Sequence, residues 1–257
     1  MEQLSVALDP AWAAGLVLSI TRVAAFAVAS PMLARVVPLP GRLATILAVG
    51  LFLSAPMEGP LTLAALLGAG AVNAAVGATL GYLTGVLFHM FAVAGGVVDV
   101  VSGLSVAQVI DPTRGEQGAV FSRLFNLTGL AVFFVAGGLE LLVRGLSMSV
   151  EVVALDGALA GSSALLDVAA RQTSRLMLVG AELALPVVSA LFIVEVVLGL
   201  ASRFAPQANV FLLGLPAKLL IALSMVSVAL LLFPEAMDGL LRATAGTFTD
   251  GLRALRG

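Results

Sequence analysis

The chain has 257 residues, of which 60% are hydrophobic and only 11% are charged, and its formal net charge is −2. A soluble domain averages about 25% charged residues, and a surface so poor in charge would aggregate in water, so the composition indicates an integral membrane protein. The absence of Cys excludes disulfides and thiolate metal sites, the single His leaves little material for a metal site, and no basic tract suggests a nucleic-acid partner.

The first quarter of the chain predicts two apolar helices joined by a short basic loop. The first is Ala11–Leu33, which carries Arg22 within it, and the second is Leu43–Ala55. The loop between them contains Arg35, and the turn Pro56–Pro60 closes the second segment. No positive region precedes the first apolar run, so we expect no cleavable signal peptide.

A long apolar block, Leu61–Val101, leads to the middle of the chain. A membrane span needs about 20 apolar residues, and this block is about twice that length. It therefore predicts either a hairpin of two spans or long kinked helices sheltered by other protein. The apolar run Val120–Leu142, the mixed segment Val143–Arg175, and the pair Met177–Leu200 and Val210–Phe233 follow, before a basic tail.

We expect about six crossings from these segments. Arginines in the first loop and in the tail place both on the cytoplasmic side, which requires an odd number of crossings. The count of six from the apolar segments and the odd number required by the arginines disagree, so the sequence leaves the membrane topology open.

The stretch Gly103–Gly118 is the main polar interruption of the apolar sequence. It contains two acids, one base and two Gln, whereas Pro60–Val98 and Leu124–Leu139 contain no Asp, Glu, Lys or Arg. Its backbone groups would lack hydrogen-bond partners in lipid. The stretch must therefore lie in water, in protein or in a water-filled cavity.

Gly77, Gly81 and Gly85 recur at helical spacing and form a ridge on which another helix can pack closely. Such a ridge fits a contact with another subunit and also fits packing within this chain. The sequence does not separate the two interpretations.

Several ionisable residues lie in or near apolar runs, and such groups usually face a cavity or a partner. They are Arg22, Asp99, Glu140, Glu182, Glu195 and Lys218. A proton-coupled small-molecule transporter using Glu182 and Glu195 is one interpretation. The other is that the acids pair with bases of this chain or of neighbouring subunits, and the different helical sides of Glu182 and Glu195 favour it.

His89 is expected to be a packed or interfacial residue, and the lack of hydrolase and phosphate-loop motifs argues against an enzyme.

An ordered set of residues along nearly the whole chain resembles a known family. It includes Arg22 with Ser30-Pro31 and Pro38, the GATLGYLTG segment, Asp99 before Gly103-Leu104-Ser105 and Asp111-Pro112, and Ala184-Leu185-Pro186. The most specific stretch is LGLASRFAPQANVFLLGLPAK, with Arg203, Pro206, Gln207, Asn209, Phe211, Gly214, Pro216 and Lys218 in register. With these residues the chain resembles the FliR/SctT family of type III export-gate proteins.

The resemblance implies an all-α, non-enzymatic channel subunit without metal or cofactor, one export-gate domain over residues 1–257. It would assemble with FliP-like and FliQ-like subunits and FlhB in the bacterial inner membrane at the flagellar basal body, and conduct unfolded substrates. Residues 11–60 resemble the start of a FliP-type subunit, and residues 176–234 resemble a FliQ-type hairpin. Subunit contacts are expected at Gly77, Gly81, Gly85, Arg203, Pro206, Gln207, Asn209, Phe211 and Lys218.

The resemblance also assigns a pore plug to the polar stretch. The plug residues are Gly103, Leu104, Ser105, Val106, Ala107, Gln108, Val109, Ile110, Asp111, Pro112, Thr113, Arg114, Gly115, Glu116 and Gln117. Family members often carry aromatic residues flanking the positions of Val106 and Val109, where this chain has aliphatic ones. This chain also has Gly96 and Leu139 where the family often has Glu and His. The departures imply a plug of smaller side chains and a looser seal.

Overall fold

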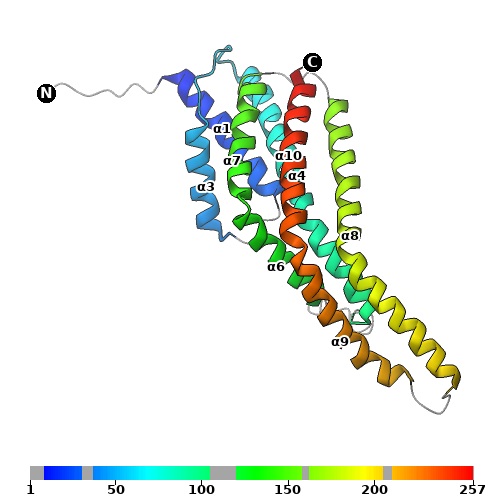
Figure 1. Cartoon of the computed structure of the whole chain (residues 1–257). Coiled ribbons are helices and arrows are strands. Elements are labelled where there is room, and N and C mark those ends of the chain that lie inside the picture. Colours follow the sequence, from blue (N-terminus) through cyan, green and yellow to red (C-terminus); the bar gives the residue numbers. More distant parts are fainter. Residues whose placement is uncertain (1–8, 31–36, 105–119, 158–161, 205–209, 257) are drawn as a thin grey trace. The chain divides into compact units, whose positions relative to one another are not determined.

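A computed structural model describes the chain except residues 1–8, 31–36, 105–119, 158–161, 205–209 and 257 (Figure 1). The described residues form helices and connecting turns without a strand, which confirms the predicted all-α fold. The helices are α1 (Pro10–Ala29), α3 (Leu39–Phe52), α4 (Leu63–Ser102), α6 (Val120–Val135), α7 (Gly138–Val152), α8 (Ser162–Phe204), α9 (Val210–Leu231) and α10 (Phe233–Arg256).

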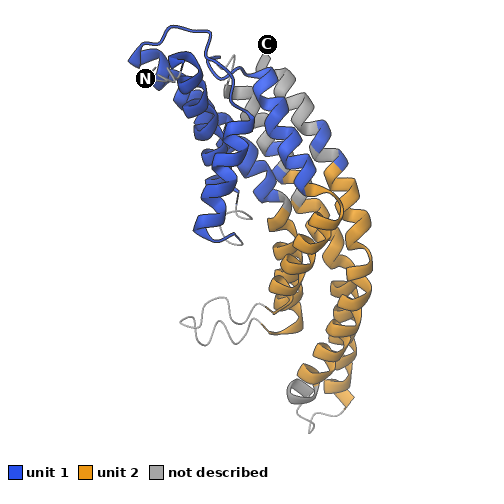
Figure 2. Ribbon diagram, turned by 90° about the vertical axis from the view of Figure 1, so that its left-hand side faces the viewer, with its two compact units in different colours: residues 1–86, 139–173, 242–257 blue, residues 87–138, 174–241 orange. Residues whose placement is uncertain are grey.

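The chain divides into two compact units, coloured separately in Figure 2. Unit 1 consists of residues 1–86, 139–173 and 242–257, and unit 2 consists of residues 87–138 and 174–241. The predicted FliP-like start belongs to unit 1, and the whole of the predicted FliQ-like hairpin belongs to unit 2. The assignment of one export-gate domain to the whole chain stays a prediction.

Unit 1 is built around α1, which packs closely against its neighbours because glycines remove side chains at the contacts. A Cβ on Gly15 would overlap the carbonyl oxygen of Ala55, and a Cβ on Gly50 would lie 2.8 Å from the Cγ1 of Ile20. The Ser19 hydroxyl donates a 2.7 Å hydrogen bond to the carbonyl of Gly50. Small residues thus bring α1 and α3 into backbone contact.

Unit 2 is centred on a cluster of phenylalanines. Phe233, at the start of α10, packs its ring 4.8 Å from that of Phe91 and 5.0 Å from that of Phe125, measured between ring centroids. Gly129 makes room for this cluster, since a Cβ there would lie 2.5 Å from the Phe91 ring. Phe88 and Phe133 form a second edge-to-face pair with centroids 4.9 Å apart. The aromatic core joins the second half of α4 to α6 and to the beginning of α10.

The apolar block after Pro60 is a single helix, α4, of 40 residues. The predicted hairpin is therefore wrong, and the predicted alternative of long helices is the one that the structure adopts. Neither a proline nor a charged residue interrupts the sequence between Leu63 and Val98, so no residue there removes a helical hydrogen bond as a proline would.

Two other expectations need correction. The apolar run Val120–Leu142 is not one segment, because α6 ends at Val135 and α7 begins at Gly138, with Gly137 between them at φ +81°. Glycine adopts this left-handed backbone conformation without the steric cost of a side chain. The C-terminal tail, which the sequence did not assign to any element, is the helix α10.

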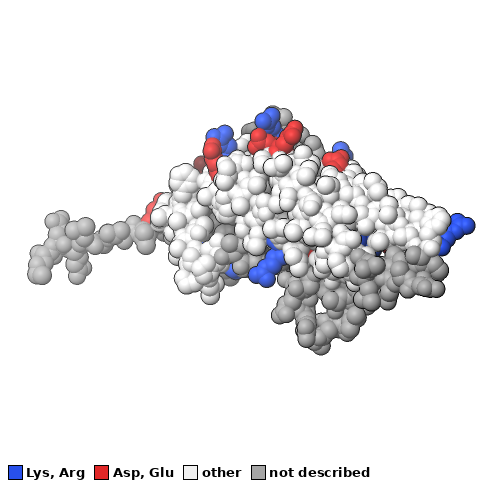
Figure 3. All heavy atoms as spheres, turned by 60° about the horizontal axis from the view of Figure 1, so that its bottom comes forward, with Lys and Arg blue, Asp and Glu red and all other residues white. Residues whose placement is uncertain are grey.

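Four helices in the described part of the chain are long and apolar enough to cross a membrane, or five if the bent pair α6–α7 counts as one span. They are α1, α4, the Met177–Phe204 part of α8 and the Gly214–Leu231 part of α9. The described helices that are long and apolar enough are fewer than the six crossings expected, mainly because α4 is one helix and not a hairpin. On the face drawn in Figure 3, most of the described surface is uncharged.

Candidate functional site

The polar stretch begins where α4 ends, and the described part of the chain resumes at the first residue of α6. α4 ends at Ser102, and Gly103 turns the chain with φ +86° and an N–H bonded to the Val100 carbonyl at 3.2 Å. The next described helix starts at Val120. Of the predicted plug, only Gly103 and Leu104 are described, and residues 105–117 lie outside the described residues.

Asp99 connects the two ends of this stretch. Its side chain is 1% exposed, and its Oδ1 and Oδ2 accept hydrogen bonds of 2.9 Å each from the backbone N–H groups of Phe121 and Ser122. These N–H groups belong to the first turn of α6, where an α-helix has no internal acceptors and where its dipole favours a negative charge. The Ser122 hydroxyl also donates to the Ala92 carbonyl at 2.8 Å. Asp99 therefore caps α6 from a different helix.

This role differs from the one expected for the acids of the apolar runs. We expected Asp99 to pair with a base, yet the partners of its carboxylate are backbone N–H groups. The physical reason is that the first turn of α6 offers several otherwise unsatisfied N–H donors together, and these stabilise a buried carboxylate.

A groove lies next to this junction in unit 2, between the end of α4, the second half of α8 and the start of α9, and it encloses about 660 Å³. Figures 1 and 2 show these parts of α8 and α9 running beside each other. Most of the lining side chains are apolar. The lining residues are Val100, Val101, Gly103, Val188, Leu191, Phe192, Glu195, Leu198, Gly199, Ser202, Gly214, Leu215 and Lys218.

An ion pair between Lys218 of α9 and Glu195 of α8 forms the polar part of the groove. The prediction that the acids pair with bases of this chain is confirmed for Glu195. Glu182 lies thirteen residues earlier on α8 and is exposed outside the groove lining. The two acids that the transporter interpretation requires are thus not brought together.

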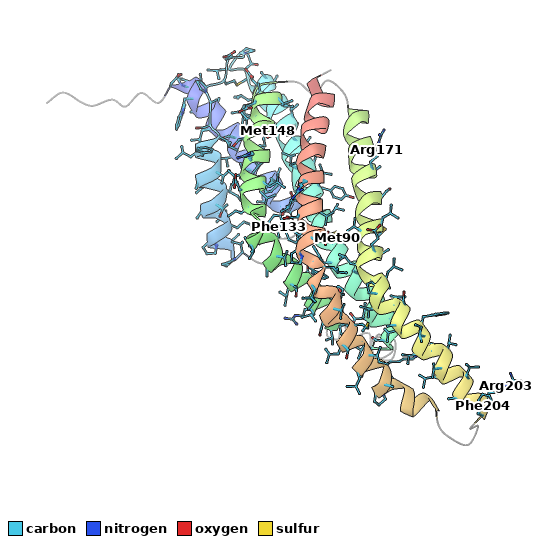
Figure 4. The ribbon with its side chains drawn as sticks, viewed as in Figure 1. Met90, Phe133, Met148, Arg171, Arg203 and Phe204 are labelled. Carbon is cyan, nitrogen blue, oxygen red and sulfur yellow. The ribbon has the colours of Figure 1, made fainter. Side chains whose placement is uncertain are left out.

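The predicted contact residues of the α8–α9 turn are described only in part. Arg203 and Phe204 are both exposed at the end of α8 (Figure 4). Pro206, Gln207 and Asn209, and the side chain of Phe211, lie outside the described residues. The role of these residues in subunit contacts stays a prediction.

The glycine ridge of α4 is buried in unit 1. A Cβ on Gly77 would overlap the carbonyl oxygen of Arg22, and one on Gly81 would overlap that of Phe26, both on α1. Gly77 and Gly81 therefore serve packing within the chain, as the second interpretation of the ridge held. A further contact of Gly77, Gly81 or Gly85 with another subunit stays a prediction.

Arg22 is fully buried in unit 1, with a side-chain exposure of 0%. Its Nε donates to Asn73 Oδ1 at 2.8 Å, its Nη1 donates to the Ser149 carbonyl at 2.7 Å, and its Nη2 donates to the Val153 carbonyl at 2.8 Å. Asn73 in turn donates to the Leu155 carbonyl at 2.6 Å. Arg22 thus binds the C-terminal end of α7, where carbonyl groups and the helix dipole favour a cation.

The expected acid–base pairing is therefore wrong for Arg22 as well, since its partners are an amide, a hydroxyl and backbone carbonyls. Arg22 stands out in the sequence as a charge within an apolar run, whereas Asn73 and Ser149 were not predicted as its partners. The signal was present for Asn73, because it is a lone amide within a charge-free apolar block, and buried polar groups need hydrogen-bond partners.

The chain is similar to known bacterial proteins along most of its length. The family model described as bacterial export proteins, family 1, matches residues 13–244. The flagellar biosynthetic protein FliR of Bacillus subtilis (strain 168) is 29% identical over 160 residues, which are 62% of each chain. The surface presentation of antigens protein SpaR of Salmonella typhimurium is 34% identical over 171 residues, 66% of this chain and 63% of that protein. The Yop proteins translocation protein T of Yersinia pestis is 32% identical over 148 residues, 57% of each chain. The chain spans roughly three fifths of the length of these curated relatives.

Proposed function

The chain belongs to the bacterial export proteins, family 1, the family of FliR and its secretion counterparts, and on that premise we propose that it is a channel subunit of a type III protein-export gate. Relatives named for flagellar biosynthesis and for translocation of Yop proteins support a role in protein export. The apolar helices support a place in the membrane, and we assign it to the bacterial inner membrane.

The observation that carries the proposal is the junction at Asp99. One buried carboxylate binds the first turn of α6 three residues before α4 ends, so both ends of the polar stretch are fixed at one place. Fixing both ends limits the space that the stretch between them can reach, which supports its assignment to a plug inside a pore. We therefore assign residues 103–117 to a plug that obstructs the channel until a substrate displaces it.

The partners we propose are FliP-like and FliQ-like subunits and FlhB, with unfolded proteins as the transported substrates. Large apolar side chains that are exposed on α3 and α8 support an assembled state. On α3 they follow a four-residue spacing, at Leu39, Leu43, Leu47 and Leu51. A helical stripe of this kind favours contact with another helix or with lipid over contact with water.

Plug deletion tests the channel function directly. The chain is co-expressed with its FliP-like and FliQ-like partners, and the assembled complex is reconstituted in a planar bilayer. Removal of Val106–Gly115 is expected to raise the ion conductance of the closed complex, because the obstruction is lost while the Asp99 junction is kept. Unchanged conductance in a correctly assembled complex would contradict the plug assignment.

A matched substitution tests the same residues in the opposite direction. Val106→Phe combined with Val109→Phe adds side-chain volume to the plug without changing its charge or length. The double variant is expected to conduct less than the wild-type complex, whereas the deletion conducts more. A double variant that conducts as much as the wild-type complex would show that the two positions do not contribute to a seal.

A further inference from the structure

The groove of unit 2 has the size and lining of a ligand site. Its volume of about 660 Å³ lies within the range of roughly 300–1,000 Å³ that is usual for small-molecule pockets. Its two long walls are the parts of α8 and α9 that qualify as membrane-crossing helices. The lining between these two helices is mostly apolar, and an acyl chain fits such a lining.

The polar part of the groove is a pair of opposite charges. The Glu195 side chain is 62% exposed, whereas the Lys218 side chain is 18% exposed. The anion is thus the more accessible charge, and the cation lies deeper in the wall. The pair has no net charge, so a ligand that complements it carries one anionic and one cationic group close together.

We propose that this groove binds a zwitterionic phospholipid with an ethanolamine head. The lipid phosphate contacts the Lys218 ammonium, the lipid ammonium donates hydrogen bonds to the Glu195 carboxylate, and an acyl chain lies along Val100, Phe192 and Leu215. The inference rests on the groove alone and does not depend on the export function.

The chemistry of the pair distinguishes three head groups. A phosphatidylglycerol head brings a negative charge to Glu195 without a compensating cation. A phosphatidylcholine head brings a cation without N–H donors, so it forms no charge-assisted hydrogen bond with the carboxylate. Only the ethanolamine head supplies a phosphate and a donating ammonium together.

Glycine keeps the groove open. A Cβ on Gly199 would meet no heavy atom within 4 Å, so a larger side chain at this position extends into empty space. Gly199→Leu therefore fills part of the groove without displacing its walls. A Cβ on Gly239 of α10 would likewise meet no heavy atom within 4 Å, and Gly239 does not line the groove, so Gly239→Leu is the matched control.

The experiment is lipid retention by the full-length chain, purified in detergent and incubated with equal amounts of phosphatidylethanolamine, phosphatidylglycerol and phosphatidylcholine. Retained lipids are counted by native mass spectrometry. The wild type is expected to retain phosphatidylethanolamine over each of the others by about tenfold, the effect of one charge-assisted hydrogen bond. Glu195→Gln is expected to lose this preference and to gain phosphatidylglycerol, because the pair then carries a net positive charge.

The groove-filling variant locates the bound lipid. Gly199→Leu is expected to lose the retained phosphatidylethanolamine, whereas Gly239→Leu keeps it. If the three lipids are retained in proportion to their supply, and neither Glu195→Gln nor Gly199→Leu changes this, the retained molecules are ordinary surrounding lipid and the proposal is overturned. If Gly199→Leu fails to fold, the Glu195→Gln variant tests the proposal by itself: loss of the preference for phosphatidylethanolamine supports the proposal, and an unchanged preference overturns it. The same measurement is made on the complex with partner subunits. If the preference for phosphatidylethanolamine is lost there, protein covers the groove, and the proposal is overturned for the assembled state.

Discussion

Asp99 of α4 accepts a 2.9 Å hydrogen bond from the backbone N–H of Phe121, the second residue of α6. The two residues lie on either side of the polar stretch, and Asp99 is 1% exposed. A capping carboxylate normally precedes its own helix by one residue. Here it comes from the preceding helix, so the capping bond also fixes where α6 starts relative to the end of α4.

Asp99→Asn is the sharpest test of this junction. The amide oxygen can replace one acceptor, but the amide nitrogen then faces an N–H group and leaves it unsatisfied. We expect a loss of about 2 kcal/mol in the free energy of unfolding. Faster hydrogen exchange is expected at the amides of Phe121 and Ser122, measured by mass spectrometry. Ser102→Ala, which removes only a 3.2 Å bond to the Asp99 carbonyl, is the control and should leave those amides protected.

Much of the fold could be predicted because apolar runs and their interruptions are read directly from residue types. The expected helices near Ala11, Leu43, Met177 and Val210 all exist. Three of them differ from the expected bounds by a few residues, whereas α8 begins at Ser162, fifteen residues before Met177. The displacement has a local cause at α3, which begins at Leu39 rather than Leu43 because Pro40 suits the first helical turn.

The rest could not be predicted because it depends on contacts between segments far apart in the chain. Nothing local to Asp99 shows that its partners are the N–H groups of Phe121 and Ser122, which lie more than twenty residues away. Arg22 likewise finds Ser149 across 127 residues. The break at Gly137 was missed because a glycine pair within an apolar run is also common in transmembrane helices.

The glycine ridge gives a stability prediction with an internal control. Gly77→Ala is expected to destabilise the chain by about 1–3 kcal/mol, since its Cβ overlaps the backbone of α1 and forces α1 and α4 apart. Gly68→Ala on the same helix meets no atom within 4 Å and should be neutral or slightly stabilising through helix propensity. The melting temperatures of the purified variants in detergent provide the comparison. Equal melting temperatures would contradict close packing at Gly77.

Arg22 is expected to be essential for the structure of unit 1. Arg22→Met keeps much of the side-chain length but leaves the carbonyls of Ser149 and Val153 and the Asn73 amide without a donor. Because these groups are buried, we expect a loss of about 3 kcal/mol or more in the free energy of unfolding. The measurement is chemical unfolding in detergent.

The control for Arg22 is an arginine in an exposed ion pair. Arg144 lies 3.0 Å from Glu140, and both side chains are at least 70% exposed. Arg144→Met is therefore expected to change the free energy of unfolding by less than about 0.5 kcal/mol. If the two variants lost similar stability, the buried network would not stabilise the fold more than a solvated pair does.

Phe233 tests whether α10 is held by the aromatic core of unit 2. Its ring is 0% exposed and packs against Phe91 and Phe125, so Phe233→Ala is expected to leave a cavity and cost about 3–5 kcal/mol. Phe134 is 45% exposed, and Phe134→Ala removes the same atoms with a smaller expected loss. The free energies of unfolding of both variants and faster amide exchange in residues 233–241 provide the measurement. Unchanged exchange in Phe233→Ala would mean that α10 is held by other contacts.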